Sequence, residues 1–172
     1  MTFSTGKDEE RGKTIFQEGL ILQDCVFEDM LSLRNVQISG EFRLTRCILS
    51  LPLPLDKSIL EKPAIWEGPG SLVACSMYQT KLLGGITIEN YKIQATKDVS
   101  LDLNSCRASE LVCLKNCKLE GDLHLKRARL SSQYNNAWTM ENCTLQTVNM
   151  EEAIVAGASQ FLQVDFQGKI LV

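Results

Sequence analysis

The sequence predicts an all-β fold in which the chain climbs a single-stranded, four-sided β-solenoid. The pattern is clearest in residues 101–130, where apolar or small residues return in pairs whose members are two positions apart. Residues two apart face the same side of an extended strand, so each pair marks a short strand that turns two side chains inward. Successive pairs start alternately five and six residues apart, which leaves three or four residues to turn a corner. About 22 residues therefore bring the chain once around four sides and back above itself.

The pairs of this central stretch are Leu101/Leu103, Cys106/Ala108, Val112/Leu114, Cys117/Leu119, Leu123/Leu125 and Ala128/Leu130. The same pairing starts at Thr14/Phe16, runs to residue 49, and returns in residues 75–93 and 138–155. Residues 1–13 are polar, charged and without a period, so we expect them to form a lead-in or a cap over the first coil. The solenoid is expected to occupy residues 14–172.

The corners of the predicted coil carry marks of their own. An Asn or Asp precedes the first residue of a pair at Asp24, Asn35, Asn90, Asn116 and Asn142. These two residue types tolerate the left-handed conformation at turns. A second fixed position is glycine, at Gly40, Gly84 and Gly121. We expect these glycines to need either a positive φ or close backbone packing.

Residues 50–74 contain all four prolines and blur the repeat. One interpretation continues the register through the pairs Leu53/Leu55, Ser58/Leu60 and Ala64/Trp66, with Pro52 and Pro54 pointing outward. The other is a loop that bulges from the side, because proline cannot donate to a strand ladder. The repeat also slips near residues 94–100 and 131–137, where we expect corner insertions. The register after Gly157 stays open.

The composition limits the compartment and the partners. The 172 residues carry 18 Lys and Arg against 21 Asp and Glu, a formal net charge of −3, which does not indicate a nucleic-acid binder. No apolar run approaches the roughly 20 residues that span a bilayer, so no membrane partner is expected. An odd number of cysteines without an export signal favours reduced thiols and a cytoplasmic location. We expect Cys25 and Cys47 to stack on successive coils in the reduced form.

Catalytic, cofactor and metal sites are not expected. All seven cysteines except Cys113 fall on inward positions, where a free thiol serves as a small hydrophobic residue. The competing interpretation, a zinc site, would need CxxC pairs, whereas Cys113 and Cys117 are four apart. The only histidine, His124, lies between two inward leucines and is therefore expected outward and solvated. No GxxxxGK phosphate-binding loop occurs.

Two surfaces are candidates for interaction. The first is a mildly basic side of the middle coils, with an aromatic anchor in the second insertion; its residues are Lys115, Lys118, His124, Lys126, Arg127, Arg129 and Tyr134. Glu120 and Asp122 interrupt it, so a solvated face of mixed charge is the other interpretation. The second is an apolar C-terminal end made by Phe161, Phe166, Ile170 and Leu171. Either a longer chain continues from this end, or the end packs against a second copy about a two-fold axis.

The inward pairs with a small residue first and Leu or Phe second are Cys25/Phe27, Cys47/Leu49, Cys117/Leu119, Ala128/Leu130 and Cys143/Leu145. This pattern resembles the pentapeptide-repeat family over most of residues 14–155. The chain departs from the family in alternating five with six residues and in lacking the usual Asp or Asn inside the pair. The resemblance implies a right-handed quadrilateral β-helix that often ends in a dimer. It also implies a link to proteins that inhibit DNA gyrase by mimicking duplex DNA.

Three functions follow as hypotheses. The first is a non-enzymatic scaffold or protein-interaction module, with another protein as its partner. The second, which rests on the resemblance alone, is a DNA-mimicking topoisomerase inhibitor; Arg34, Arg43, Arg46 and Arg107 interrupt the acidic surface that mimicry needs. The third is an enzyme built on the solenoid, with residues 50–74 as a lid.

Overall fold

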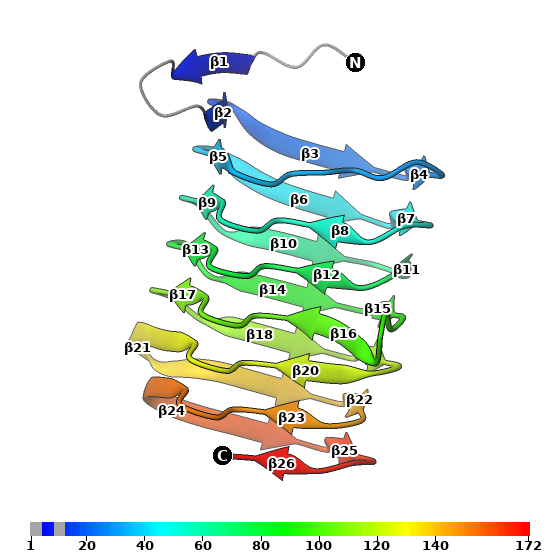
Figure 1. Cartoon of the computed structure of the whole chain (residues 1–172), viewed down its shortest axis with the longest axis vertical. Coiled ribbons are helices and arrows are strands. Elements are labelled where there is room, and N and C mark those ends of the chain that lie inside the picture. The colour runs from blue at the N-terminus through cyan, green and yellow to red at the C-terminus, as the bar shows by residue number, and fades with distance from the viewer. Residues whose placement is uncertain (1–4, 9–12) are drawn as a thin grey trace.

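The computed structural model describes residues 5–8 and 13–172, and in this part of the chain it shows an all-β solenoid of about seven coils (Figure 1). Each complete coil has four short strands, one on each side, and each strand pairs in parallel with the strand on the same side of the next coil. The predicted fold class is confirmed. The described residues include no helix that could cross a membrane.

The four sides are numbered here in chain order. Side 1 holds β3 (Gly19–Gln23), β6 (Glu41–Thr45), β10 (Ala64–Glu67), β14 (Ile86–Glu89), β18 (Val112–Lys115) and the second parts of β21 (Arg129–Glu141) and β24 (Ile154–Leu162). Side 2 holds β4 (Val26–Phe27), β7 (Ile48–Leu49), β11 (Gly70–Leu72), β15 (Tyr91–Ile93), β19 (Lys118–Leu119), β22 (Thr144–Leu145) and β25 (Asp165–Phe166). Side 3 holds β8 (Leu53–Pro54), β12 (Cys75–Ser76), β16 (Val99–Asp102), β20 (Asp122–His124), β23 (Val148–Asn149) and β26 (Ile170–Leu171). Side 4 holds β2 (Lys13–Phe16), β5 (Val36–Ile38), β9 (Ile59–Leu60), β13 (Lys81–Leu82), β17 (Arg107–Ala108) and the first parts of β21 and β24. Sides 1 and 4 belong to one hydrogen-bonded sheet because β21 and β24 run around the corner between them.

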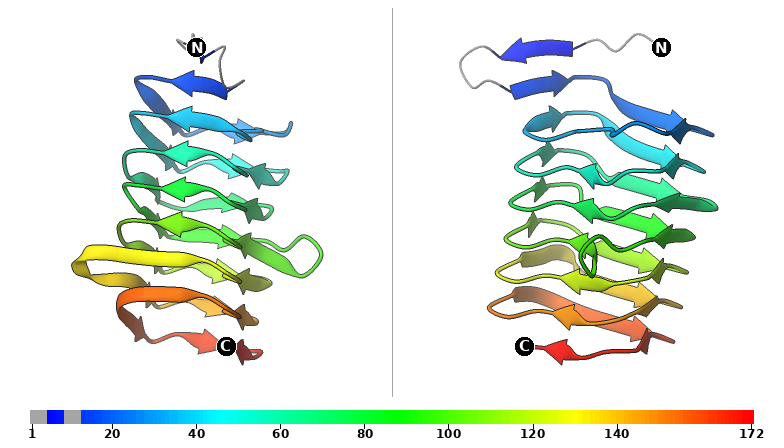
Figure 2. Two further views of the ribbon diagram at one scale, coloured as in Figure 1. Left: turned by 60° about the vertical axis from the view of Figure 1, so that its left-hand side comes forward. Right: turned by 45° about the vertical axis from the view of Figure 1, so that its right-hand side comes forward.

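The register gives the length of a coil. On side 1, Phe42 pairs with Leu20 and with Ala64, a step of 22 residues each way (42 − 20 and 64 − 42), as predicted. The step from Ile86 to Val112 is 26 residues (112 − 86). The extra residues form a turn at 94–98, closed by a bridge between Thr96 and Val99. The second insertion lengthens β21 instead, and Figure 2 shows both segments projecting from the stack.

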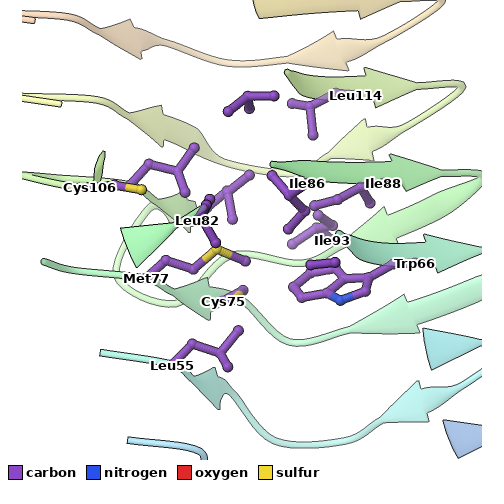
Figure 3. Close-up of a cluster of buried hydrophobic side chains, with 14 of the residues drawn as sticks. Leu55, Trp66, Cys75, Met77, Leu82, Ile86, Ile88, Ile93, Cys106 and Leu114 are labelled. Carbon is purple, nitrogen blue, oxygen red and sulfur yellow. The ribbon is translucent and has the colours of Figure 1, made fainter. Parts of the chain in front are cut away.

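The interior is filled by the predicted pairs, stacked coil on coil (Figure 3). Leu123 and Leu125 are fully buried, whereas His124 between them points outward. Phe42, Trp66 and Tyr91, from three successive coils, form an aromatic cluster with ring centroids 6.2 and 6.3 Å apart. Burial of this apolar surface is the main stabilising contribution to the stack.

Residues 50–74 continue the solenoid and contain β8–β11, so the loop interpretation is wrong. Leu53, Leu55 and Trp66 are fully buried. Pro54 is tolerated because β8 is the first regular strand of side 3, and residues 31–33 of the preceding coil form no strand that would need a proline N–H. The Pro54 carbonyl oxygen still accepts a hydrogen bond from Leu33 N–H at 2.9 Å. The inward pair that sequence analysis missed is Gly70/Leu72, because a glycine gives no apolar signal.

The corner residues behave as their types predict. The five Asn and Asp residues all have φ between 51° and 59°, in the left-handed region. The glycines of the second position serve close packing rather than a positive φ. A Cβ on Gly121, for example, would overlap the carbonyl oxygen of Asp98.

The two ends of the stack differ. At the N-terminal end β1 (Thr5–Asp8) pairs antiparallel with β2 and covers its free edge. The rest of the predicted charged cover, at residues 1–4 and 9–12, lies outside the described residues. At the C-terminal end β24, β25 and β26 form a last coil whose register the sequence left open: Phe161 pairs with Met140 and Phe166 with Leu145.

Candidate interaction surfaces

The predicted basic side does not exist as one surface, because its residues are distributed around the coil. Lys115 is on side 1, Lys118 on side 2, His124 on side 3 and Arg129 on side 4; Lys126 and Arg127 turn the corner between sides 3 and 4, and Tyr134 lies in the extension of β21. Consecutive residues along one coil necessarily pass through all four sides. Only side chains on the same side of successive coils can form a continuous surface.

Several of the predicted basic groups are also neutralised by a nearby carboxylate. Lys126 contacts Glu151 at 2.8 Å, and Arg127 forms a hydrogen-bonded pair with Glu152 at 2.8 Å. Lys115 lies 3.6 Å from Glu141. The interpretation of these groups as a solvated face of mixed charge therefore fits better than a basic side.

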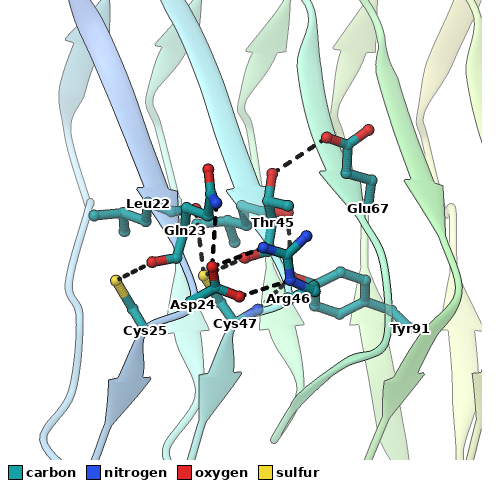
Figure 4. A network of polar contacts seen from close by, with 10 residues as sticks. Leu22, Gln23, Asp24, Cys25, Thr45, Arg46, Cys47, Glu67 and Tyr91 are labelled. Atoms are coloured by element: carbon teal, nitrogen blue, oxygen red, sulfur yellow. Dashed lines mark hydrogen bonds and ion pairs between the residues drawn. The ribbon is translucent and has the colours of Figure 1, made fainter.

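Pairing between successive coils is the general rule on this surface. Arg46 donates two hydrogen bonds to Asp24, at 2.6 and 2.7 Å, from the equivalent position one coil away (Figure 4). The Arg46 side chain lowers the pKa of the Asp24 carboxyl by hydrogen bonding. Arg43 likewise reaches Glu67 at 2.6 Å. Cross-strand pairs of opposite charge favour the native register of the coils.

A basic column on side 4 does not follow this rule. It consists of Lys81, Arg107 and Arg129, which pair with one another in register on β13, β17 and β21 and point outward. Within the described residues none of the three has a carboxylate within 4.0 Å. A depression of about 310 Å³ lies at the N-terminal end of this column, next to Lys81 and Arg107. It is also lined by the polar residues Gln79 and Ser105.

Sequence analysis found only Arg129 of this column. The step from Lys81 to Arg107 is 26 residues (107 − 81) and the step to Arg129 is 22 (129 − 107), because the first insertion lies between β13 and β17. A search for like charges at a fixed period therefore misses the column. The column can be found from the sequence if the inward pairs are aligned first and the outward residues between them are then compared. The pairs to align are Thr80/Leu82, Cys106/Ala108 and Ala128/Leu130.

A groove of about 550 Å³ on side 3 lies under the turn at 94–98. Its lining is mostly apolar, with Arg34, Lys97 and Asp102 as charged groups. Lys97 and Asp98 both have positive φ, 50° and 70°. Aspartate tolerates this left-handed conformation, whereas it is unfavourable for lysine. The buried Ser100 hydroxyl holds the turn by donating to Ile93 O at 3.2 Å and accepting from Gly121 N–H at 2.8 Å.

The thiols and the single histidine differ in burial and in their polar neighbours. All seven cysteines are free. Burial raises the pKa of Cys106 to about 12, so this thiol is not a nucleophile at neutral pH. Cys143 differs, because a hydrogen bond with the Cys117 thiol lowers its pKa to about 7, although its side chain is buried. His124 Nε2 lies 3.8 Å from Asp122 Oδ2. In the part of the chain that the structure describes, no cluster of three or more His, Cys, Asp or Glu residues could hold a metal ion.

The C-terminal coil brings together all four residues of the predicted apolar end. Phe161 is 44% exposed and Ile170 is 53% exposed, although their partners in the preceding coil, Met140 and Val148, are buried. Phe166 packs on Phe161 with ring centroids 6.3 Å apart. The outer backbone edges of β24, β25 and β26 have no neighbouring strand in the described residues. We call this surface the open end.

The fold and these surfaces define a class, the four-sided β-solenoid. No model of a known protein family matches the chain, and no curated protein matches it.

Proposed function

We propose that this protein is a non-enzymatic scaffold or protein-interaction module that associates with a second copy of itself through the open end. The observation that carries this proposal is the open end itself. It combines exposed apolar side chains, Phe161 and Ile170 among them, with a full set of unpaired strand edges. Exposed edges of this kind are sites of strand addition.

A second copy is the occupant that fits best. The open end has the outline of one coil and offers hydrogen-bonding groups on each side of it, and another coil end has the same outline and the same spacing of strands. A two-fold axis would set β24 antiparallel to its symmetry mate and bring the apolar groups of both ends together. The opposite end of the stack does not offer the same surface, because β1 already pairs with the edge of β2.

Light scattering on the 172-residue chain tests the proposal. At tens of micromolar the mass of a dimer is expected. The variant F161D/I170D is expected to be monomeric and to keep a cooperative thermal melt, at a lower temperature because Phe161 loses its contact with Trp138. The control is I48D/L83D, which adds the same charges at exposed apolar positions in the middle of the stack and should stay dimeric. A wild-type chain that stays monomeric at these concentrations would refute self-association.

The likeness to pentapeptide-repeat proteins supports the same proposal, because that family often dimerises at solenoid ends. It supports gyrase inhibition less well. Mimicry of DNA needs a continuous acidic surface, whereas Arg34, Arg43 and Arg46 are interleaved with the carboxylates that they neutralise. The seven free thiols support a cytoplasmic location.

A further inference from the structure

We infer that the basic column on side 4 binds an acidic segment of a partner protein. This inference names a partner for the interaction module proposed above, but it uses a different surface. The column lies on the flank of the middle coils, formed by β13, β17 and β21, whereas the open end is formed by β24, β25 and β26.

The first argument is the contrast with the rest of the surface. Four of the six described arginines are paired with a carboxylate, each by at least one contact of 3.2 Å or less. The two without a carboxylate partner, Arg107 and Arg129, are stacked directly on each other. Like charges opposite one another on neighbouring strands are destabilising, so this arrangement opposes the stability of the isolated stack.

The second argument is the regular spacing of the three basic residues along the solenoid axis. Adjacent strands are about 4.8 Å apart, so the three cations span about 10 Å along the solenoid axis. The rigid ladder holds their backbone positions in line, and each arginine can bind a carboxylate through two parallel hydrogen bonds. The same outward ladder has isoleucine at each end, Ile59 before Lys81 and Ile154 after Arg129. The complementary segment is therefore acidic in its centre with apolar residues on both sides.

A protein segment fits this column better than a nucleic acid does. The outward residues of the ladder from Ile59 to Ile154 include no aromatic side chain on which bases could stack. Three cations within about 10 Å can neutralise only a few phosphates, which gives little affinity for a nucleic acid. The chain as a whole also has a net charge of −3, which repels a phosphate backbone. An acidic segment with about three carboxylates needs no wider basic surface.

The test uses a fluorescein-labelled peptide of sequence Leu-Glu-Glu-Glu-Leu and fluorescence anisotropy at low and high salt. The wild-type protein is expected to bind it with an affinity that falls as salt rises. The variant K81Q/R107Q/R129Q is expected to bind at least about tenfold more weakly, since three exposed ion pairs are lost. The matched control K92Q/K115Q/K118Q removes the same charge from sides 1 and 2 and should bind within about twofold of wild type.

Two further measurements separate the outcomes. Removing like-charge repulsion should leave the melting temperature of K81Q/R107Q/R129Q equal to or above that of the wild type, so weaker binding is not a folding defect. Light scattering should give that variant the same mass as wild type, whatever that mass is, so failure of self-association does not affect this test. Equal losses in the two triple variants, or tighter binding of hexathymidylate than of the peptide, would overturn the inference.

Discussion

The effects of substitutions at Gly70 and Tyr91 on stability should be strongly coupled. The two residues face each other in register on β11 and β15, and the Tyr91 ring fills the space that a side chain at position 70 would need. A Cβ on Gly70 would overlap the ring and lie 2.8 Å from Cε2. The Tyr91 hydroxyl reaches past this glycine to the coil beyond, where it accepts from Cys47 N–H at 3.3 Å and donates to Leu44 O at 3.2 Å.

The substitution Gly70→Ala should therefore lower the free energy of unfolding by about 1–3 kcal/mol, the usual effect of overpacking a core. Tyr91→Leu removes the three ring atoms that the new Cβ would meet. It should itself cost about 1–3 kcal/mol, because the buried Cys47 N–H loses its partner. In the Tyr91→Leu background, Gly70→Ala should become neutral or stabilise by about 0.5 kcal/mol, since Gly70 has no positive φ and alanine restricts the unfolded chain.

Urea denaturation of the four proteins of this cycle measures the coupling, which should be about 2 kcal/mol. Ser71→Ala, at the outward neighbour of Gly70, is the control and should change the stability by less than about 0.5 kcal/mol. If Gly70→Ala is equally damaging with tyrosine and with leucine at position 91, the ring is not what excludes a side chain there.

Three other outcomes are expected. Leu123→Asp should unfold the middle coils in thermal melts because it buries an unpaired charge, whereas His124→Ala should change stability by less than about 0.5 kcal/mol; equal damage would show that the inward register is wrong. Burial raises the pKa of Tyr91 to about 12 from 10, so its contribution to stability is complete below pH 10 and is lost as the pH rises to 12. Tyr91→Phe should accordingly flatten the decline of stability between pH 10 and 12, and an unchanged decline would refute the assignment. In native protein a thiol reagent should modify Cys25 and Cys113, which are partly exposed, well before the other five cysteines, and uniform modification would contradict the packing.

The fold was predictable because a solenoid repeats one rule at every coil. The inward pairs, the 22-residue coil and the left-handed Asn and Asp corners all follow from side-chain alternation and local turn preferences, and each is confirmed. The pair Gly70/Leu72 escaped because a neighbouring coil, through Tyr91, supplies the missing volume. That compensation acts between residues 21 apart in sequence (91 − 70), and no local pattern records it.

The surfaces were much less predictable. Outward side chains are under no packing rule, so the run of basic residues in positions 115–129 suggested one basic side where the structure places them on four. The column of Lys81, Arg107 and Arg129 became visible only with the register, since an insertion changes the spacing between its first two members. The four residues of the apolar end are Phe161, Phe166, Ile170 and Leu171. They could be grouped from the sequence because they lie within ten positions of one another at the end of the chain, in what the structure shows to be the last coil.

The two insertions have a consequence for how such a chain can change. The extra residues of the turn at 94–98 disturb the strand pairing only locally. By Leu101 the chain is again in register with the coil before it, at Cys75, and with the coil after it, at Leu123. A corner can therefore gain residues while the coils above and below keep their hydrogen bonds. This makes the corner between β15 and β16 a natural place for new loops to evolve, and a practical place to graft a foreign peptide that is to be displayed on a rigid support.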